Sequence, residues 1–401
     1  MNLKSGCIFW PEINRDLERE FNPLDRDITC DVAIIGGGIS GALVAYYLTR
    51  AGIESILVDR RHVGHGSTSA STGLLQYEID TPLVHLAKLI GKDRAIAAYR
   101  ASLDAMLAFE PLVAEIGDSC GLVGRPSFYL ASSEKDAHEL RAEAEARRAM
   151  GINVDFVEAD QLRGEFGISR PAALWSAKAF EVDPFRLTIR LIDQSISQGL
   201  RVFDRTEIAC FEWPGQGVLL HTSEGPRIAA KKVIFATGYE TMEQIPSGLC
   251  QLKSTYALVS QPLTSFASWP DQCLIWETAR PYLYLRTTQD NRAIVGGADE
   301  PIVDAKRRDA LLEAKTRDLT EKAAHLLPDV SIDPEFAWAG TFAETKDGLP
   351  YIGTLPQLPH CYFALGYGGN GITFSLLAAW IIRDRFLGRE NELSHLFAFG
   401  R

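Results

Sequence analysis

The feature that most constrains this chain is a short glycine-rich sequence near its start. Residues 31–41 read Asp-Val-Ala-Ile-Ile-Gly-Gly-Gly-Ile-Ser-Gly, a buried strand that leads directly into a glycine turn. The apolar spacing of residues 42–50 then predicts a helix, with Gly52 behind it as its end. A second buried strand is expected over residues 53–58, and Asp59 stands at its carboxyl end.

These parts form a GxGxxG motif between a strand and a helix, and each glycine has a physical role. Gly36 permits the tight turn, Gly38 lets a pyrophosphate approach the backbone, and Gly41 lets the helix lie close to the strand. The helix N-terminus offers free N–H groups and the positive end of its dipole to phosphates. Asp59, 18 positions after Gly41, is placed to accept hydrogen bonds from a ribose diol. The motif therefore predicts a dinucleotide-binding unit.

A loop rich in small hydroxyl residues follows the acidic residue and Arg60. It begins with Gly66, Ser67, Thr68 and Ser69 and ends at Gly73. Its hydroxyl groups could donate to the phosphate and ribitol oxygens of an extended, buried cofactor. The alternative is a flexible serine-rich loop at the surface.

Two later segments also resemble cofactor-binding turns. The apolar strand expected over residues 232–235 ends in Ala236, Thr237 and Gly238, which are small enough to pass close to a cofactor. An ordinary strand-to-loop turn explains this segment equally well. Near the C-terminus, a strand over residues 360–365 leads through a glycine-rich turn into a helix that begins at Ile372. The positive end of that helix would stabilise the negative charge of a reduced flavin ring.

The middle of the chain predicts strands of a different sheet. They are expected over residues 254–260, 273–277, 282–287 and 292–296. In the third of these, Tyr282, Tyr284 and Arg286 alternate and so share one face of the strand. This face either lines a substrate pocket or faces solvent with aromatic cross-strand pairs.

The composition is that of an ordinary globular protein, with 46% hydrophobic and 23% charged residues among 401. This length allows two interleaved domains. The formal net charge of −11 argues against nucleic acid as a partner, because a polyanion would be repelled. No apolar run approaches the ~20 residues that span a bilayer, and the first ten residues lack a secretory signal. Seven scattered cysteines are typical of reduced thiols in a cytoplasmic protein, and their spacing indicates no metal site.

Taken together, these segments resemble the FAD-dependent oxidoreductases of the D-amino-acid oxidase superfamily. The group includes glycine oxidase, sarcosine oxidase and gamma-glutamylputrescine oxidoreductase. The resemblance extends from Asp31 to Arg383. It rests on the first glycine motif, Asp59 with the serine-rich loop, the Ala-Thr-Gly at 236–238, and two C-terminal segments. The latter are Thr-Lys-Asp-Gly-Leu-Pro-Tyr-Ile-Gly at 345–353 and Gly-Tyr-Gly-Gly-Asn-Gly-Ile-Thr-Phe-Ser at 366–375.

The resemblance implies an α/β protein with a Rossmann-like FAD-binding domain. This domain is expected to comprise residues 1–84, 151–248 and 338–401. It would be interleaved with an α+β substrate domain of mixed, largely antiparallel sheet over residues 85–150 and 249–337. The implied reaction is oxidation of a C–N bond by hydride transfer to flavin N5, which gives an imine that hydrolyses. The electrons would then pass to O2 or another acceptor.

The same resemblance implies which residues form the site. The expected FAD-binding residues are Gly36, Gly38, Ile39, Ser40, Gly41, Asp59, Arg60, Gly66, Ser67, Thr68, Ser69, Ile208, Ala236, Thr237, Gly238, Asp347, Gly369, Asn370, Gly371, Ile372 and Thr373. The expected substrate-pocket residues are Tyr256, Tyr284, Arg286 and Thr373.

Three positions depart from the family's patterns. Gly340 stands where sarcosine-oxidase-like members have the cysteine that tethers FAD, so noncovalent FAD is expected. Phe342 replaces the arginine that holds the substrate carboxylate in glycine-oxidase-like members, and Thr373 replaces the lysine of the sarcosine type. A small amino-acid substrate would therefore need Arg286 or Lys253 to supply the positive charge.

Two alternative functions stay open at this point. One is a flavin dehydrogenase that oxidises a hydroxy acid or polyol and passes electrons to a quinone. The other is a flavoprotein whose FAD is structural. The sequence does not identify the amine, the electron acceptor or the oligomeric state.

Overall fold

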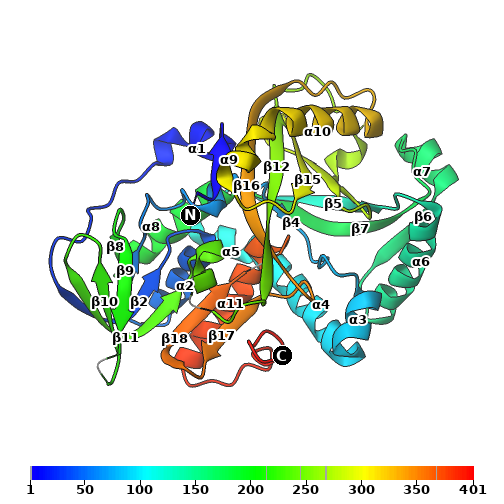
Figure 1. Cartoon of the computed structure of the whole chain (residues 1–401). Helices are drawn as coiled ribbons and strands as arrows, with labels where there is room; N and C mark the ends of the chain where they lie inside the picture. The colour runs from blue at the N-terminus through cyan, green and yellow to red at the C-terminus, as the bar shows by residue number, and fades with distance from the viewer. Residues whose placement is uncertain (1, 214, 244, 267–268, 367) are drawn as a thin grey trace.

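The computed structural model describes residues 2–213, 215–243, 245–266, 269–366 and 368–401. Its strands form two separate sheets that lie side by side, with helices packed against both (Figure 1). The fold is a mixed α/β architecture, which confirms the expected fold class.

The smaller sheet is built on the glycine-motif strand β2 (Ile28–Ile35). Its strand order is β17-β18-β11-β2-β3-β8, with β10 paired to β11 and β9 paired to β10. Strands β18, β11, β2, β3 and β8 run parallel, and β17 is antiparallel to β18. Strand β2 is central and almost fully buried over its last four residues, as a parallel strand covered on both faces should be. The bounds of the other strands are β3 Ser55–Val58, β8 Arg201–Phe203, β9 Ile208–Glu212, β10 Val218–Thr222, β11 Arg227–Phe235, β17 Tyr351–Leu355 and β18 Leu358–Leu365.

The larger sheet is mostly antiparallel and has the order β1-β16-β12-β15-β14-β13-β5-β7-β4, with β6 paired to β7. Only the β13–β5 pair on this path is parallel. The strand bounds are β1 Lys4–Gly6, β4 Leu74–Leu75, β5 Val123–Leu130, β6 Val154–Glu158, β7 Ala172–Glu181, β12 Cys250–Ser260, β13 Leu274–Glu277, β14 Leu283–Thr287, β15 Ala293–Glu300 and β16 Pro334–Thr345.

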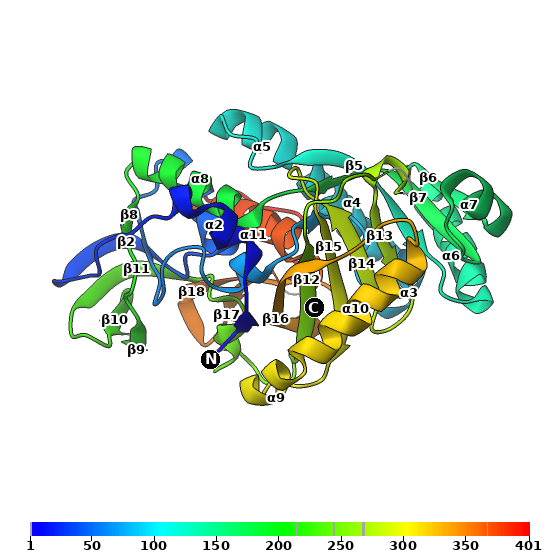
Figure 2. The same cartoon turned by 90° about the horizontal axis from the view of Figure 1, so that it is seen from above.

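Helices cover the sheets in two groups. Helix α2 follows β2 directly and packs between α8 and α11, so these three cover the smaller sheet. Helix α10 lies across strands β12, β14 and β15 of the larger sheet, as Figure 2 shows from above. The helix bounds are α1 Phe9–Ile13, α2 Ile39–Arg50, α3 Leu83–Ile90, α4 Lys92–Leu107, α5 Phe109–Ile116, α6 Glu134–Ala149, α7 Ala159–Phe166, α8 Pro184–Ser197, α9 Ala305–Ala310, α10 Leu312–Leu326 and α11 Gly371–Phe386.

The chain passes repeatedly between the two sheets. The first segment supplies β2 and β3 to the smaller sheet, and the chain returns to it with β8–β11 and again with β17–β18. The expected division placed 151–248 wholly with the FAD-binding segments, whereas β6 and β7 from this range pair in the larger sheet. We propose that the two domains divide along the two sheets.

Tyr256, expected in a substrate pocket, lies in the core of the larger sheet. Its side chain is 1% exposed, and its hydroxyl donates to the backbone carbonyl of Arg308 at 3.2 Å. The Lys315 ammonium of α10 lies 5.7 Å from the ring centroid. The expectation is therefore corrected: Tyr256 packs the sheet against its covering helices.

Arg286 on β14 also lies in the core, where it forms buried hydrogen bonds. Its Nη1 donates to the carbonyl oxygens of Thr72, Gly73 and Val182 at 3.2, 2.8 and 2.8 Å, and its Nε lies 3.8 Å from the Glu181 carboxylate. The side chain is only 2% exposed. It shares a strand face with Tyr284, as alternation predicted, but the serine-rich loop covers it. The expectation of a substrate contact is corrected to a role in holding that loop.

We expect Arg286→Met to destabilise the fold. It would leave buried carbonyl groups without donors and remove one of the two arginines beside Glu181, the other being Arg125 at 3.1 Å. The expected loss in the free energy of unfolding is about 2–4 kcal/mol, measured by urea denaturation. Arg317→Met, on the exposed face of α10, is the matched control and should change it by under about 0.5 kcal/mol. Coincident curves for Arg286→Met and the unmodified protein would contradict the structural role.

Candidate functional site

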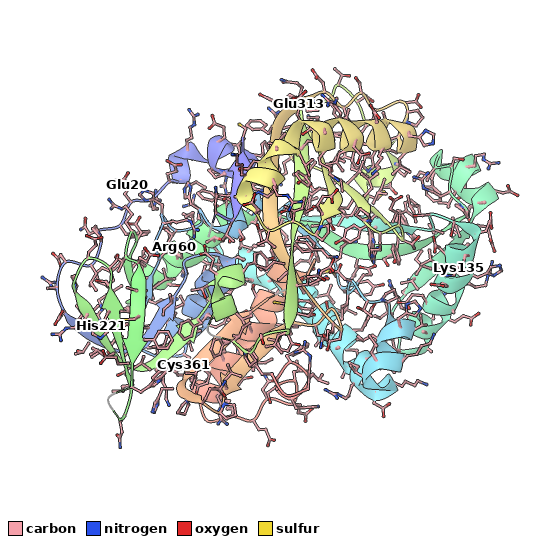
Figure 3. The ribbon with its side chains drawn as sticks, in the orientation of Figure 1. Glu20, Arg60, Lys135, His221, Glu313 and Cys361 are labelled. Carbon is pink, nitrogen blue, oxygen red and sulfur yellow. The ribbon has the colours of Figure 1, made fainter. Side chains whose placement is uncertain are left out.

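One large cavity, of about 820 Å³, is bounded by both glycine turns, the serine-rich loop and six strands of the larger sheet. Chain segments far apart in the sequence meet there. The sequence-predicted residues that line it are Gly36, Gly38, Ile39, Ser40, Asp59, Arg60, Gly66, Ser67, Thr68, Ile208, Ala236, Thr237, Gly238, Tyr284, Gly369, Asn370, Gly371 and Ile372. Figure 3 labels Arg60 on the side of the smaller sheet, whereas Lys135 lies at the opposite end of the molecule.

The first glycine motif leaves no room for side chains at two of its positions. Gly36 has φ +108°, and a Cβ there would lie 2.4 Å from the carbonyl oxygen of Ala236. A Cβ on Gly41 would lie 1.8 Å from the Gly36 carbonyl oxygen. A Cβ on Gly38 would meet one atom closely, the Thr68 hydroxyl oxygen at 2.9 Å. The glycines therefore allow β2, α2 and β11 to converge at the cavity wall.

Asp59 closes this end of the cavity and is held by main-chain donors. One carboxylate oxygen accepts from the Gly37 N–H at 2.6 Å and the other from the Arg61 N–H at 2.7 Å. Burial raises the pKa of Asp59, and these two hydrogen bonds oppose the rise. Glu240 pairs with both neighbouring arginines, at 2.8 Å in the case of Arg61.

The N-termini of α2 and α11 are joined directly. The Ser40 and Ser375 hydroxyl oxygens lie 2.7 Å apart, and the Ile39 N–H donates to the Thr68 hydroxyl at 2.9 Å. A Cβ on Gly366 would lie 2.7 Å from the Gly371 carbonyl oxygen, so the second turn is also tightly folded. The positive ends of two helix dipoles thus face one cavity.

The N-terminal segment adds a wall that the sequence did not predict. Strand β1 pairs with β16, with Lys4 opposite Gly340, and Leu3 lines the cavity. The Lys4 ammonium donates to the hydroxyl of Ser69, which lies just behind the lining. Burial, with a smaller effect of the Arg61 charge, lowers the pKa of Lys4 to about 8.

The opposite end of the cavity, the sheet end, is formed by the larger sheet and the segment after the serine-rich loop. Its lining includes Gln76, Glu78, Asp80, Thr255, Trp276, Tyr282, Tyr284, Asp299, Thr341 and Phe342. Asp80 accepts from the Gly369 N–H at 2.8 Å and from the Tyr282 hydroxyl at 3.4 Å. Asp80 therefore ties the second glycine turn to β14.

Burial shifts the ionisation of the groups at the sheet end. It raises the pKa of Asp299 to about 6, against a hydrogen bond from Thr255 that lowers it. Burial and the nearby Asp299 carboxylate raise the pKa of Tyr284 to about 12. The pKa of Tyr282 also rises, through burial and the Asp80 and Asp299 charges. Both phenols therefore stay protonated at neutral pH and can donate hydrogen bonds.

Six predicted site residues do not line the cavity. Gly41 and Ser69 lie immediately behind its wall, and Tyr256 and Arg286 lie in the core as described. Asp347 bonds the Arg401 guanidinium at 2.8 and 3.0 Å, and so anchors the C-terminus instead. Thr373 is 1% exposed, on the buried side of α11. Tyr367, within the second glycine turn, lies outside the described residues.

Sequence reasoning missed Asp80 and Asp299 as lining residues. It placed Tyr282 on a strand face that could line a substrate pocket, without including it among the expected pocket residues. Asp80 follows the serine-rich loop without any motif, and Asp299 is the penultimate residue of β15, after a run of apolar residues and glycines. The alternation of Tyr282 with Tyr284 was the one available signal. The pairing of β12 with β15 and β16 brings Asp299 on β15 to the cavity, and this pairing is seen only in the tertiary structure.

The described lining has a limited set of reactive side chains. It contains no Cys, His or Lys, and its only cations are Arg60 and Arg61. No cluster of three or more metal-binding side chains occurs within the ranges described above. In those same ranges, every helix is too short or too polar to cross a bilayer.

Known proteins resemble the whole chain. Glycine oxidase of Geobacillus kaustophilus (strain HTA426) is 27% identical over 365 residues, which cover 88% of this chain and 92% of that protein. Gamma-glutamylputrescine oxidoreductase of Escherichia coli (strain K12) is 24% identical over 377 residues, 92% of this chain and 86% of that protein. The crystal structure of glycine oxidase from Geobacillus kaustophilus has the same fold, with a TM-score of 0.76 at 23% identity. It covers 93% of this chain and 99% of that one.

The family match spans nearly all the elements described above. Residues 31–385, from the start of the glycine motif through α11, match the family described as DAO, FAD dependent oxidoreductase. The chain is therefore a member of the DAO family of FAD-dependent oxidoreductases.

Proposed function

We propose that this enzyme oxidises a C–N bond of an amine or amino acid. The observation that carries the proposal is a single cavity that joins a dinucleotide-binding glycine motif to a pocket of phenols and carboxylates. The names of two relatives support it, since glycine oxidase and gamma-glutamylputrescine oxidoreductase act on an amino acid and an amine.

The cavity wall fits FAD in its shape and its polar groups. Gly36 and Gly38 line the cavity without side chains, which suits the close approach of a pyrophosphate, and Asp59 lines the same end, where it is placed for a ribose. The buried Nε2 of Gln76 has no hydrogen-bond partner among the described residues, so a ligand is needed to satisfy it. We propose that the other residues that were predicted for FAD and line the cavity, from Ile39 to Ile372 in the chain, hold the rest of the cofactor.

When bound, FAD supplies the acceptor for a hydride. The substrate C–H bond next to nitrogen would break with loss of the hydrogen and its electron pair as hydride, and the nitrogen lone pair would form a C=N bond. Water then adds to the imine carbon and the C–N bond breaks, which releases a carbonyl product and the amine or ammonia. The two electrons taken from each substrate molecule would go on to O2 or another acceptor.

The protein's own groups orient the substrate and complement charge. The N-terminus of α11, at Gly371 and Ile372, presents a positive dipole end that favours negative charge on a reduced ring. The protonated phenols of Tyr282 and Tyr284 are hydrogen-bond donors that can position the substrate. The substrate nitrogen must be neutral when hydride leaves, and the chemistry requires no further acid or base.

Anaerobic reduction of the purified flavoprotein tests this function. We expect the visible flavin bands to bleach on addition of an amine or amino-acid pool, because the substrate delivers two electrons to the ring. Bleaching by hydroxy acids or polyols alone would favour the quinone-linked alternative. A flavin that none of the pools bleaches would favour a structural role. A cytoplasmic location also remains a prediction.

We expect the FAD to be noncovalent, because Gly340 and Phe342 line the cavity and no cysteine or histidine of the described chain does so. Acid precipitation should therefore release essentially all of the yellow colour into the supernatant, where absorbance measures it. A flavin retained in the washed pellet would contradict this expectation.

The raised pKa of Asp299 predicts a stability that depends on pH. The folded-state pKa of about 6 lies above the ordinary 3.8. The contribution of protonated Asp299 to the free energy of unfolding is therefore full below pH 3.8 and is lost as pH rises through 6. Asp299→Asn should therefore unfold at a higher temperature than the unmodified protein at pH 8, with a smaller gain at pH 5. The expected increase in the free energy of unfolding of Asp299→Asn at pH 8 is about 1–3 kcal/mol.

Differential scanning calorimetry of the FAD-loaded proteins measures this difference. Asp318→Asn, an exposed change on α10, corrects for general effects of removing a carboxylate. A gain for Asp299→Asn that is equal at both pH values would contradict the raised pKa.

A further inference from the structure

The two ends of the cavity carry opposite kinds of charge. Both of its cations, Arg60 and Arg61, lie at the dinucleotide end and contact Glu240. At the sheet end, the ionisable lining groups of the described chain other than the phenols are all carboxylates, namely Glu78, Asp80 and Asp299. A ligand with a negative group would meet no cation among the described residues that line the sheet end.

The nearby cations are already engaged. Lys253, the remaining candidate for a carboxylate anchor, pairs with Glu344 at 2.5 Å. Arg147 is fully buried and is bonded to Glu143 at 2.8 Å and to Glu78 at 3.3 Å. Arg280 is exposed, and its guanidinium donates to backbone carbonyls, including that of Asp80 at 3.2 Å. None of these three lines the cavity.

Asp80 and Asp299, in contrast, are held by neutral donors. Asp80 accepts from the backbone N–H of Gly369 and from the Tyr282 phenol, and Asp299 is bonded to the Thr255 hydroxyl. Neither carboxylate forms an ion pair with any residue that the structure describes. The Arg280 charge acts on Asp80 and the Lys253 charge on Asp299, but neither cation forms an ion pair with the carboxylate. Burial of these two carboxylates is therefore only partly compensated, and a cationic ligand would relieve the remaining cost.

Aromatic rings beside these carboxylates favour the same kind of ligand. Tyr282 and Tyr284 have ring centroids 5.7 Å apart, and Trp276 lies 6.4 Å from Tyr282. The faces of aromatic rings attract ammonium groups, most strongly where water is excluded. The Arg280 guanidinium already lies 4.8 Å from the Tyr282 ring centroid. The Tyr284 ring and the two aspartates are therefore the groups that would suit an organic ammonium ion.

We propose that the substrate is a diamine-like compound, whose second ammonium group is bound at the sheet end by Asp80 and Asp299. This inference rests on the proposed C–N oxidation. The neutral nitrogen is the one oxidised, while the charged nitrogen fixes the register of the molecule in the cavity. Amino acids, which present a carboxylate to the same groups, would be poor substrates.

Compounds of equal length but different charge test the proposal. Anaerobic stopped-flow reduction at about pH 8.5 would compare 1,4-diaminobutane, butylamine and 4-aminobutanoate. We expect the rate constant divided by Kd to be about tenfold or more higher for the diamine than for butylamine, and lowest for 4-aminobutanoate. Faster reduction by 4-aminobutanoate or glycine than by the diamine would overturn the proposal while leaving C–N oxidation intact.

Variants locate the effect. Asp299→Asn should raise the Kd of the diamine about tenfold or more and change that of butylamine less than about twofold. Asp80→Asn also weakens the hold on the second glycine turn, so it should raise both Kd values, and that of the diamine more than that of butylamine. Glu300→Gln is the matched control, because Glu300 follows Asp299 but pairs with Lys315 outside the cavity. Equal losses for both amines in the aspartate variants would contradict a site for the second ammonium.

A binding measurement keeps the inference independent of turnover. Calorimetric titration of the FAD-loaded protein would use butane-1,4-bis(trimethylammonium), which has no nitrogen lone pair to oxidise, and adipate, a dicarboxylate of similar length. We expect binding of the dication and its loss in Asp299→Asn. Tighter binding of adipate would overturn the proposal. If no amine bleached the flavin, C–N oxidation would fail, and this titration would still decide the charge preference.

Discussion

The whole site depends on the close approach of two glycine turns and the helices that follow them. Gly41 lies against the Gly36 carbonyl, and Gly36 lies against the Ala236 carbonyl, at separations that exclude any side chain. The hydroxyl contact between Ser40 and Ser375 then joins α2 to α11. Because these contacts bring together strands from three distant parts of the chain, they define where the cavity can form. A methyl group at either glycine would separate elements that the rest of the site requires to be adjacent.

Charge divides this cavity into two functional regions. The dinucleotide end has two helix N-termini and two arginines, which suit a pyrophosphate and a reduced ring. The sheet end has buried carboxylates and aromatic rings with no free cation among the described lining residues. Under the proposed function, this separation would place negative charge of the cofactor and positive charge of the substrate at opposite ends. It also explains why the usual carboxylate anchors expected of such enzymes have no counterpart at Phe342 and Thr373.

Residue type alone was ambiguous for the substrate pocket. Arg286 has the chemistry to bind a carboxylate, yet four backbone carbonyls and Glu181 surround its guanidinium. Tyr256 has a phenol like Tyr284, but its side chain lies on the α10 side of the sheet. Asp299, which no motif marks, reaches the cavity. In each case the deciding factor is the face and position along a strand, which depends on pairing with distant strands.

The sequence by itself determined the dinucleotide-binding unit and the mixed α/β class. Its signals are local: apolar runs, glycines where no side chain fits, and an acidic residue at the end of β3 act over a few tens of residues. Most of the residues predicted for FAD from these signals do line the cavity. Only the tertiary structure decided the composition of the sheet end, because Asp80, Tyr282 and Asp299 meet through long-range pairing and loop packing. Burial also set the pKa of Asp299, since desolvation depends on every neighbouring element and not on the residue's own sequence.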